Sequence, residues 1–254
     1  MCRMGFVSSD HNVEETSYIR SATSFYGKSQ RDGMGYAYVV RDSIESFKTP
    51  QAAPIYWNTH PTTKRIYTKS IIWHTRFASN GAVAFRNTHP FVNGSVALAH
   101  NGVLHNFTAA KNELAANGYV FESDTDSEII LAAYMLHGLE FIEYLRARGV
   151  TGSLTVMILT RKNILLYTNA NAMVIYHTRV NDVNYLYGVS DTSFLGYFKS
   201  RPIKNYVLYS ISEASIKALK YVEFPAKSYS VEYGDFSSGD DWWVKYVDRS
   251  QQKL

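Results

Sequence analysis

The chain has 254 residues and 46% of them are hydrophobic, so it is long enough for one large domain or two small ones with a substantial core. The net charge of +4 comes from scattered basic residues, which argues against nucleic acid or a membrane surface as a partner. Cys2 is the only cysteine, which excludes an internal disulfide framework and predicts a reducing, cytoplasmic location. No signal peptide or membrane helix is predicted, because the opening segment carries acidic residues and the apolar runs are too short.

Apolar runs in the first half predict strands over residues 2–8, 34–41, 70–74 and 96–100, with helices over 14–23 and 107–117. The third of these strands leads into His74-Thr75-Arg76. The fourth leads into Asn101-Gly102, a pair that is typical of turns. Both motifs are therefore expected at strand ends, where binding sites are commonly built.

The second half opens with a helix signal. Thr125 and Glu128 have the spacing of a capping box, and they predict a helix that ends near Gly149. Apolar side chains at helical spacing form one face of this helix. After Gly152, strands are expected over residues 153–160, 164–169, 173–178, 184–189, 206–210 and 228–233. Two helical regions between two groups of strands predict two sheets flanked by helices.

Cys2 is a candidate nucleophile because it directly follows Met1. Removal of Met1 would leave an α-amine and a thiol on the same residue. A thiol needs a base to become the reactive thiolate, and an α-amine with a pKa near ~8 can be that base at neutral pH. The alternative is a small buried cysteine that only packs.

Four further segments follow Cys2 in a specific order. Residues 74–81 read HTRFASNG, residues 87–91 read NTHPF, residues 99–102 read AHNG, and residues 123–128 read SDTDSE. Together with Met1-Cys2, this order resembles the glutaminase domain of class II glutamine amidotransferases, a branch of the N-terminal nucleophile (Ntn) hydrolases. The motifs span about residues 2–131, and looser similarity continues to about residue 200. The resemblance implies one α+β domain over residues 2–254, built as a four-layer αββα sandwich of two mainly antiparallel sheets.

The resemblance also implies a reaction and a substrate. Cys2 would hydrolyse the side-chain amide of L-glutamine to glutamate and ammonia through a thioester, with no cofactor and no metal. The substrate's two charges need partners. Arg76 suits the α-carboxylate because its planar fork can bind both oxygens, and Asp126 suits the α-ammonium. A structural arginine and an acid that merely favours a helix N-terminus are the alternatives.

The remaining site residues follow from the same motifs. Asn101 and Gly102 match the family's oxyanion hole, although an ordinary Asn-Gly turn is the alternative. Phe77 and Ser79, with Asn80 and Gly81, match the glutamine pocket, but Ser79 and Asn80 replace a Thr-His pair. Arg3 stands where the best-known members have glycine.

Several alternatives stay open at this stage. His74, His89, His100 and His105 match no zinc signature and are expected to be structural. Asp240-Asp241-Trp242-Trp243 is either a docking surface or a terminal strand. An Ntn-type amidase acting on another γ-glutamyl or acyl amide, and a non-catalytic binding protein, remain the rival functions. The multidomain relatives carry a synthase domain that receives the ammonia, so we expect either a separate ammonia-acceptor protein as a partner or a plain hydrolase.

Overall fold

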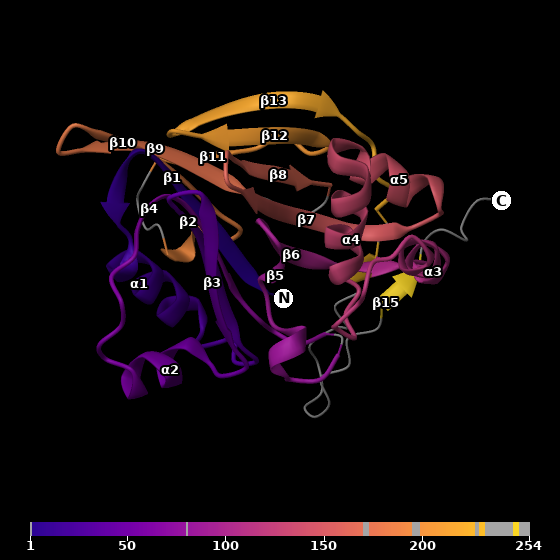
Figure 1. Ribbon diagram of the computed structural model, residues 1–254, viewed down its shortest axis with the longest axis horizontal. Coiled ribbons are helices and arrows are strands. Elements are labelled where there is room, and N and C mark those ends of the chain that lie inside the picture. Colours follow the sequence, from indigo (N-terminus) through magenta and orange to yellow (C-terminus); the bar gives the residue numbers. More distant parts are fainter. Residues whose placement is uncertain are drawn as a thin grey trace, which may run out of the picture.

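The computed structural model describes residues 2–79, 81–169, 173–194, 199–226, 229–231 and 246–248. Two β-sheets stack face to face, and helices cover both outer faces (Figure 1). Helices α1 (Thr16–Tyr26) and α2 (Ala53–Thr59) cover one sheet, and α3 (Thr108–Ala116), α4 (Glu128–His137) and α5 (Phe141–Ala147) cover the other. The α+β, αββα sandwich expected from the sequence is therefore confirmed.

Every strand pairing within the two sheets is antiparallel. Sheet A has the order β11-β9-β10-β1-β4-β2-β3, and sheet B has the order β13-β12-β8-β7-β6-β5. The strands of sheet A are β1 (Arg3–Glu14), β2 (Met34–Val40), β3 (Ser43–Thr49), β4 (Tyr67–Thr75), β9 (Val174–Val180), β10 (Val183–Val189) and β11 (Arg201–Pro202). Those of sheet B are β5 (Phe91–Asn93), β6 (Val96–His105), β7 (Thr151–Thr160), β8 (Ile164–Thr168), β12 (Val207–Ser212) and β13 (Ser215–Tyr221). Strands β14 (Tyr229–Val231) and β15 (Tyr246–Asp248) pair separately.

Strand alternation decides which side chains enter the layer between the sheets. In β1, Met4 and Phe6 lie in this layer, whereas Val7 packs on the helices outside sheet A. In β6, Ala97 and Ala99 lie in the same layer. Because successive side chains of a strand point to opposite faces, residue 2 is in phase with the inward side chains of β1 and residue 101 with those of β6.

Aromatic side chains cover the outer face of sheet A, and this accounts for many of the 20 tyrosines in the chain. Tyr176 and Tyr187 stack with ring centroids 4.8 Å apart, and Tyr26 stacks on Trp73 at 5.6 Å. Paired rings on neighbouring strands stabilise a sheet beyond their buried area. These tyrosines therefore have a packing role beneath α1 and α2.

Three expectations from the sequence were wrong in detail. Strand β6 runs through Asn101-Gly102, which lie opposite Thr155 and Leu154 of β7 rather than in a turn. The helix after residue 125 is broken by a 3-10 turn over Gly138–Glu140, where Gly138 has φ +56°. The capping box does not form, because α4 begins at Glu128 with Ser127 as its N-cap and has no side-chain cap.

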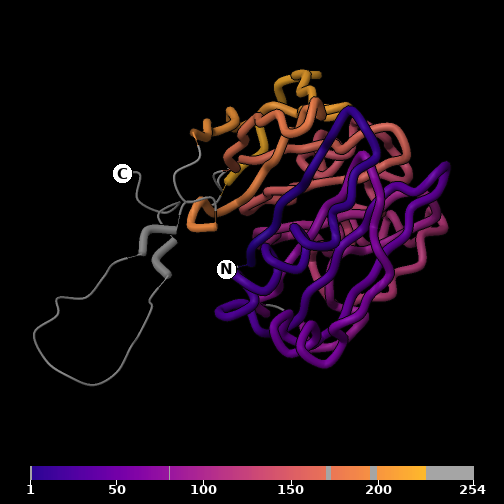
Figure 2. The backbone as a smooth tube through the Cα atoms, turned by 90° about the vertical axis from the view of Figure 1, so that its left-hand side faces the viewer, coloured from indigo at the N-terminus to yellow at the C-terminus, as the bar shows by residue number. Residues whose placement is uncertain are grey.

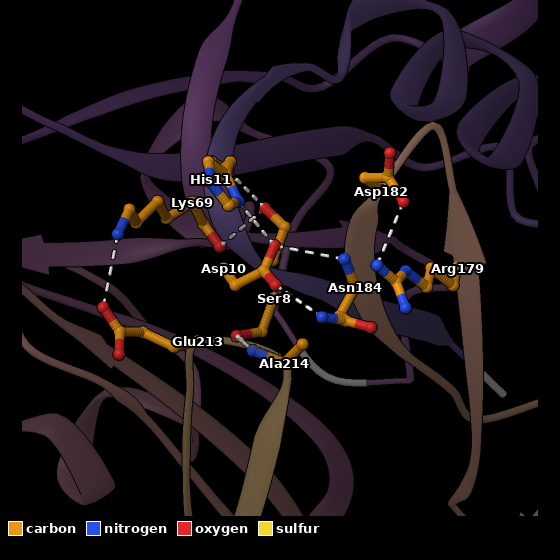
Figure 3. A network of polar contacts seen from close by, with 10 residues as sticks. Ser8, Asp10, His11, Lys69, Arg179, Asp182, Asn184, Glu213 and Ala214 are labelled. Atoms are coloured by element: carbon orange, nitrogen blue, oxygen red, sulfur yellow. Dashed lines mark hydrogen bonds and ion pairs between the residues drawn. The ribbon is translucent and has the colours of Figure 1, made fainter.

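Polar contacts hold β1 at Ser8 and Asp10, away from Cys2 (Figure 3). The Asp10 carboxylate accepts hydrogen bonds from the backbone N–H of Asn184 on β10 at 3.1 Å and from the Asn184 side chain at 2.6 Å. The Ser8 hydroxyl accepts one from the Ala214 N–H at 3.2 Å, at the turn between β12 and β13. The Asp10 contacts tie β1 to β10 within sheet A, and the Ser8 contact joins sheet A to sheet B, while the opposite end of β1 adjoins Cys2. Figure 2 shows the start of β1 at the edge of the sandwich.

The predicted strand over residues 228–233 is described only as β14, and Trp242 and Trp243 lie outside the described residues, as does Asn80. Within the described ranges, no helix is long and apolar enough to cross a membrane.

Glu15 is a buried carboxyl group at the start of α1. The residue is 3% exposed, and its side chain does not cap the helix. Burial, and the neighbouring Glu14 charge, raise the pKa of Glu15 to about 8. An unfolded glutamate titrates near ~4.3. The folded chain therefore keeps a proton between about pH 4 and pH 8 that the unfolded chain releases, so stability falls as the pH rises across this range.

Replacement of Glu15 by glutamine should remove this loss of stability. We expect the melting temperature of Glu15→Gln to fall less between pH 5 and pH 8 than that of the parent, with about 2–4 °C for each kcal/mol recovered. Thermal unfolding at both pH values measures this. Glu213→Gln is the control, because the Glu213 side chain is 70% exposed. An equal pH dependence in the Glu15→Gln variant and the parent would show that Glu15 is ionised in the folded chain.

Candidate active site

The pairing of β1 with β4 brings Cys2 to the first motif. The two strands are antiparallel with Arg3 opposite Thr75, so β1 begins where β4 ends. The backbone N–H of Phe77 points to the Cys2 Sγ at 3.3 Å. Strand β6 of sheet B packs against β1 and β4. The start of β1, the residues after β4 and the middle of β6 therefore meet at one edge of the sandwich.

The Cys2 thiol lies among charges of both signs. Burial raises its pKa, while the hydrogen bond from the Phe77 N–H and the positive charge of Arg76 lower it. The negative charge of Asp126 raises it. Cys2, Arg76 and Asp126 are therefore close enough to act on one another electrostatically.

Arg76 is buried and orders the loop that follows it. Its guanidinium donates hydrogen bonds to the carbonyls of Ala82 at 2.9 Å and Gly81 at 3.1 Å. On the other side, the Arg76 N–H donates to the Gly33 carbonyl at 2.8 Å, and its carbonyl accepts from the Asp32 N–H at 3.0 Å. The Asp32 carboxylate also accepts from the Ala78 N–H at 2.8 Å. The arginine is thus held on both sides by backbone contacts.

The three acids of the 123–128 segment have different partners. Asp124 forms an exposed ion pair with Arg86 at 2.7 Å. Glu128 is buried and accepts hydrogen bonds from the N–H groups of Glu122 at 3.0 Å and Ser123 at 2.7 Å, so it closes the turn before α4 instead of capping the helix. Asp126 is also buried, and its carboxylate accepts from the Leu104 N–H of β6 at 2.6 Å. Of the three, only Asp126 is fixed to β6 beside the cysteine.

Asn101 and Gly102 lie in the ladder between β6 and β7. Asn101 is 3% exposed. Gly102 has φ +157°, and a Cβ there would lie 2.0 Å from the Ser153 carbonyl oxygen, so no other residue fits without moving β7. The strand alternation directs Asn101 to the layer between the sheets, the same layer as Cys2.

His100 holds this part of β6 against α4. Its Nδ1 lies 2.9 Å from the Ser127 hydroxyl and its Nε2 lies 3.3 Å from the Ser153 carbonyl. A carbonyl only accepts, so Nε2 carries the proton and Nδ1 accepts from Ser127. Burial lowers the pKa of His100, although the Asp126 charge opposes this. We therefore assign it as a neutral structural residue.

His74 and His89 form a buried pair. Their ring centroids lie 4.3 Å apart, and burial lowers the pKa of His74 to about 3 and holds that of His89 well below its usual value. Across the described ranges, no group of three or more His, Cys, Asp or Glu side chains is arranged to hold a metal ion. Both rings are therefore neutral parts of the core behind the site.

The remaining predicted residues lie at the surface of the site. Phe77 is 49% exposed, and Ser79 is exposed on the loop after Arg76. The sequence reasoning missed Asn87, which is buried and joins two loops. Its side chain donates to the Ala82 carbonyl at 3.1 Å and accepts from the Asp124 N–H at 3.0 Å. Its place in the NTHPF segment was the available signal.

The charges around Cys2 predict opposite shifts of the thiol pKa in two variants. Asp126→Asn should lower the pKa of the thiol and speed alkylation by iodoacetamide near neutral pH, because a negative neighbour is removed. Arg76→Gln should raise the pKa and slow the reaction. Alkylation against pH, followed by intact mass, reads only Cys2 because it is the single cysteine. Asp124→Asn and Arg86→Gln are matched controls from the exposed pair. Shifts of the same sign in both test variants would contradict the arrangement.

Comparison with known proteins identifies the domain. Residues 62–165 match the model of a family described as a glutamine amidotransferase domain. A glutamine–fructose-6-phosphate aminotransferase (isomerizing) of Chlorobaculum tepidum is 53% identical over 62 residues, which are 24% of this chain and 10% of the relative. The corresponding protein of Chlamydia pneumoniae is 39% identical over 108 residues, which are 42% of this chain and 18% of the relative.

Solved structures share the fold at low sequence identity. Glutamine phosphoribosylpyrophosphate amidotransferase from B. subtilis superposes with a TM-score of 0.67 at 19% identity, over 87% of this chain and 49% of that chain. A glutamine aminotransferase class-II domain protein from Silicibacter pomeroyi gives 0.58 at 14% identity, over 87% of this chain and 100% of that chain. The chain thus spans about half of the first structure and a small part of the curated relatives. Residues 62–165 therefore match a glutamine amidotransferase domain, and the fold is one that solved glutamine amidotransferases share.

Proposed function

We propose that this chain is a glutaminase, a single glutamine amidotransferase type 2 domain over residues 2–254 that releases ammonia from L-glutamine. One observation carries the proposal. A single cysteine lies 3.3 Å from the Phe77 N–H, within electrostatic range of a buried arginine and a buried aspartate. A substrate with a carboxylate and an ammonium group needs both of these charges.

The proposed reaction begins after removal of Met1. The α-amine of Cys2 takes the thiol proton, and the thiolate attacks the side-chain carbonyl carbon of glutamine. The negative oxygen of the tetrahedral intermediate is stabilised by the Asn101 side-chain amide and the Gly102 N–H. Loss of one such donor costs about 10²–10³ in rate. The α-ammonium then gives its proton to the leaving group, ammonia departs, and water hydrolyses the γ-glutamyl thioester.

The two charged residues have a different task from the oxyanion donors. Arg76 binds the substrate α-carboxylate and Asp126 its α-ammonium, while Phe77 and Ser79 line the pocket mouth. These substrate groups do not change during the reaction. Their loss weakens ground state and transition state alike, which raises KM with little change in kcat.

The steady-state kinetics of glutamine hydrolysis should therefore distinguish the charged residues from the oxyanion donors. We expect Arg76→Lys, which keeps the charge but loses the fork, and Asp126→Asn to raise KM for glutamine. Asn101→Ala should instead lower kcat by about 10²–10³ with a smaller change in KM, because its hydrogen bond strengthens as the oxyanion forms.

Two outcomes would change the assignment. Unchanged glutamine saturation in both Arg76→Lys and Asp126→Asn would favour the rival Ntn-type amidase, whose substrate is not an amino acid. If Asn101→Ala changes only KM or only the melting temperature, Asn101 has a structural role and does not stabilise the oxyanion. Arg86→Lys controls for loss of a guanidinium on the neighbouring loop.

The fate of the ammonia is part of the proposal. Either a separate acceptor protein binds near the active-site mouth or the chain is a plain hydrolase. The single cysteine is consistent with our further proposal that the protein works in the cytoplasm.

A further inference from the structure

Arg3 is the residue next to the nucleophile, and it makes an ion pair across sheet A. Its Nε lies 2.7 Å from the Asp191 Oδ2, and the two side chains are 26% and 25% exposed. The Arg3 Nη1 also donates to the carbonyl of Cys2 at 3.1 Å. The guanidinium therefore connects the backbone of the nucleophile to a residue that follows β10.

Asp191 is itself held on several sides. Its Oδ1 accepts from the Ser193 N–H at 2.8 Å and from the Ser193 hydroxyl. Its carbonyl accepts from the Tyr26 hydroxyl of α1. Against burial, which raises the pKa of Asp191, the Ser193 hydrogen bonds and the Arg3 charge lower it. The carboxylate is therefore charged and fixed at neutral pH.

Ser190, the residue before Asp191, also forms hydrogen bonds with β1. Ser190 donates its N–H to the Met4 carbonyl at 2.9 Å and accepts from the Met4 N–H with its hydroxyl at 3.0 Å. Residue 2 lies just before the strand, which begins at Arg3. Its carbonyl is held by the Arg3 side chain.

We propose that Arg3 and Asp191 are positioning residues that hold the N-terminal cysteine in its reactive orientation, Arg3 by binding the Cys2 carbonyl and Asp191 by fixing Arg3. This inference rests on the proposed function, in which the nucleophile and its base belong to the same residue. Holding the carbonyl fixes the peptide plane and the position of the Cys2 Cα, from which both amine and thiol extend, while the Phe77 N–H holds the thiol itself. A displacement of about 1 Å at such a site can cost about 10² in rate.

The pair also places a positive charge one hydrogen bond from the Cys2 carbonyl, with the negative charge of Asp191 paired to it. Arg76 and Asp126, whose charges act on the Cys2 thiol, stay unchanged in the variants below. Arg3→Gln leaves Asp191 unneutralised, so the ammonium form of the amine becomes easier to form and its pKa rises. Asp191→Asn leaves Arg3 unneutralised, so the pKa of the amine falls.

Two measurements test the pair on the full chain, with removal of Met1 checked by intact mass. In the first, Arg3→Lys, Arg3→Gln and Asp191→Asn should lower kcat for glutamine by about 10- to 100-fold while KM stays within about twofold. The double variant Arg3→Gln/Asp191→Asn should lose much less than the product of the single losses, because the two residues act as a unit. Arg179→Lys and Asp182→Asn, from the exposed ion pair at the β9–β10 turn, are matched controls.

The second measurement does not need glutamine. An N-terminal cysteine condenses with acetaldehyde to a thiazolidine, with loss of one water, and the reaction requires its amine and its thiol. Intact mass against pH gives the apparent pKa of the amine. We expect a rise in Arg3→Gln and a fall in Asp191→Asn, a pair of opposite shifts that a purely structural role would not produce.

The outcomes distinguish the proposed glutaminase function from the positioning role of Arg3 and Asp191. If the parent chain does not hydrolyse glutamine but the opposite pKa shifts appear, the proposed function fails and the positioning pair stands. If the parent hydrolyses glutamine and the folded variants keep its kcat and its pH dependence, the proposed function stands. The positioning role of Arg3 and Asp191 is then overturned. Losses confined to KM, or to melting temperature, would also overturn it.

Discussion

The antiparallel pairing of β1 with β4 is the constraint on which the site depends. Its register sets Arg3 opposite Thr75, and so the residue before β1 meets the residues after β4. The Phe77 N–H then lies 3.3 Å from the Cys2 Sγ without any long loop. A one-residue slip of this register would turn the side chains of β1 to the other face of the sheet. Cys2 and Arg76 would then face different layers of the sandwich.

Buried hydrogen bonds hold the other residues of the site in place. An unpaired polar group inside the sandwich would cost free energy of folding. Asp32 and the Gly33 carbonyl hold Arg76 from one side, and its own loop holds it from the other. Asn87 joins that loop to the acidic segment, and Asp126 joins the acidic segment to β6. The charges of Arg76 and Asp126 are thus fixed by short contacts between backbone and side chain, which is how a preorganised site is built.

Much of this could be predicted from the sequence, because the motifs are local and ordered. Strands that reach His74 and His100 follow from their apolar patterns, and Asp126 could be separated from Asp124 and Glu128 by its place in the motif. The position of Asn101 in mid-strand could not, because it depends on pairing with Thr155 of β7. The role of Glu128 depends on how the preceding turn folds back onto it. The partner of Arg3 lies 188 residues away in the chain, and no local pattern shows such a contact.

The central claim is that Cys2 is the nucleophile that attacks a glutamine side chain. Its most direct test is the intact mass of the chain after treatment with a glutamine analogue that carries a diazoketone in place of the amide. The account predicts one covalent equivalent on the N-terminal cysteine of the parent chain, competed by glutamine, and none on Cys2→Ala. Labelling that persists in Cys2→Ala, or a parent chain that hydrolyses glutamine yet takes up no label, would contradict it.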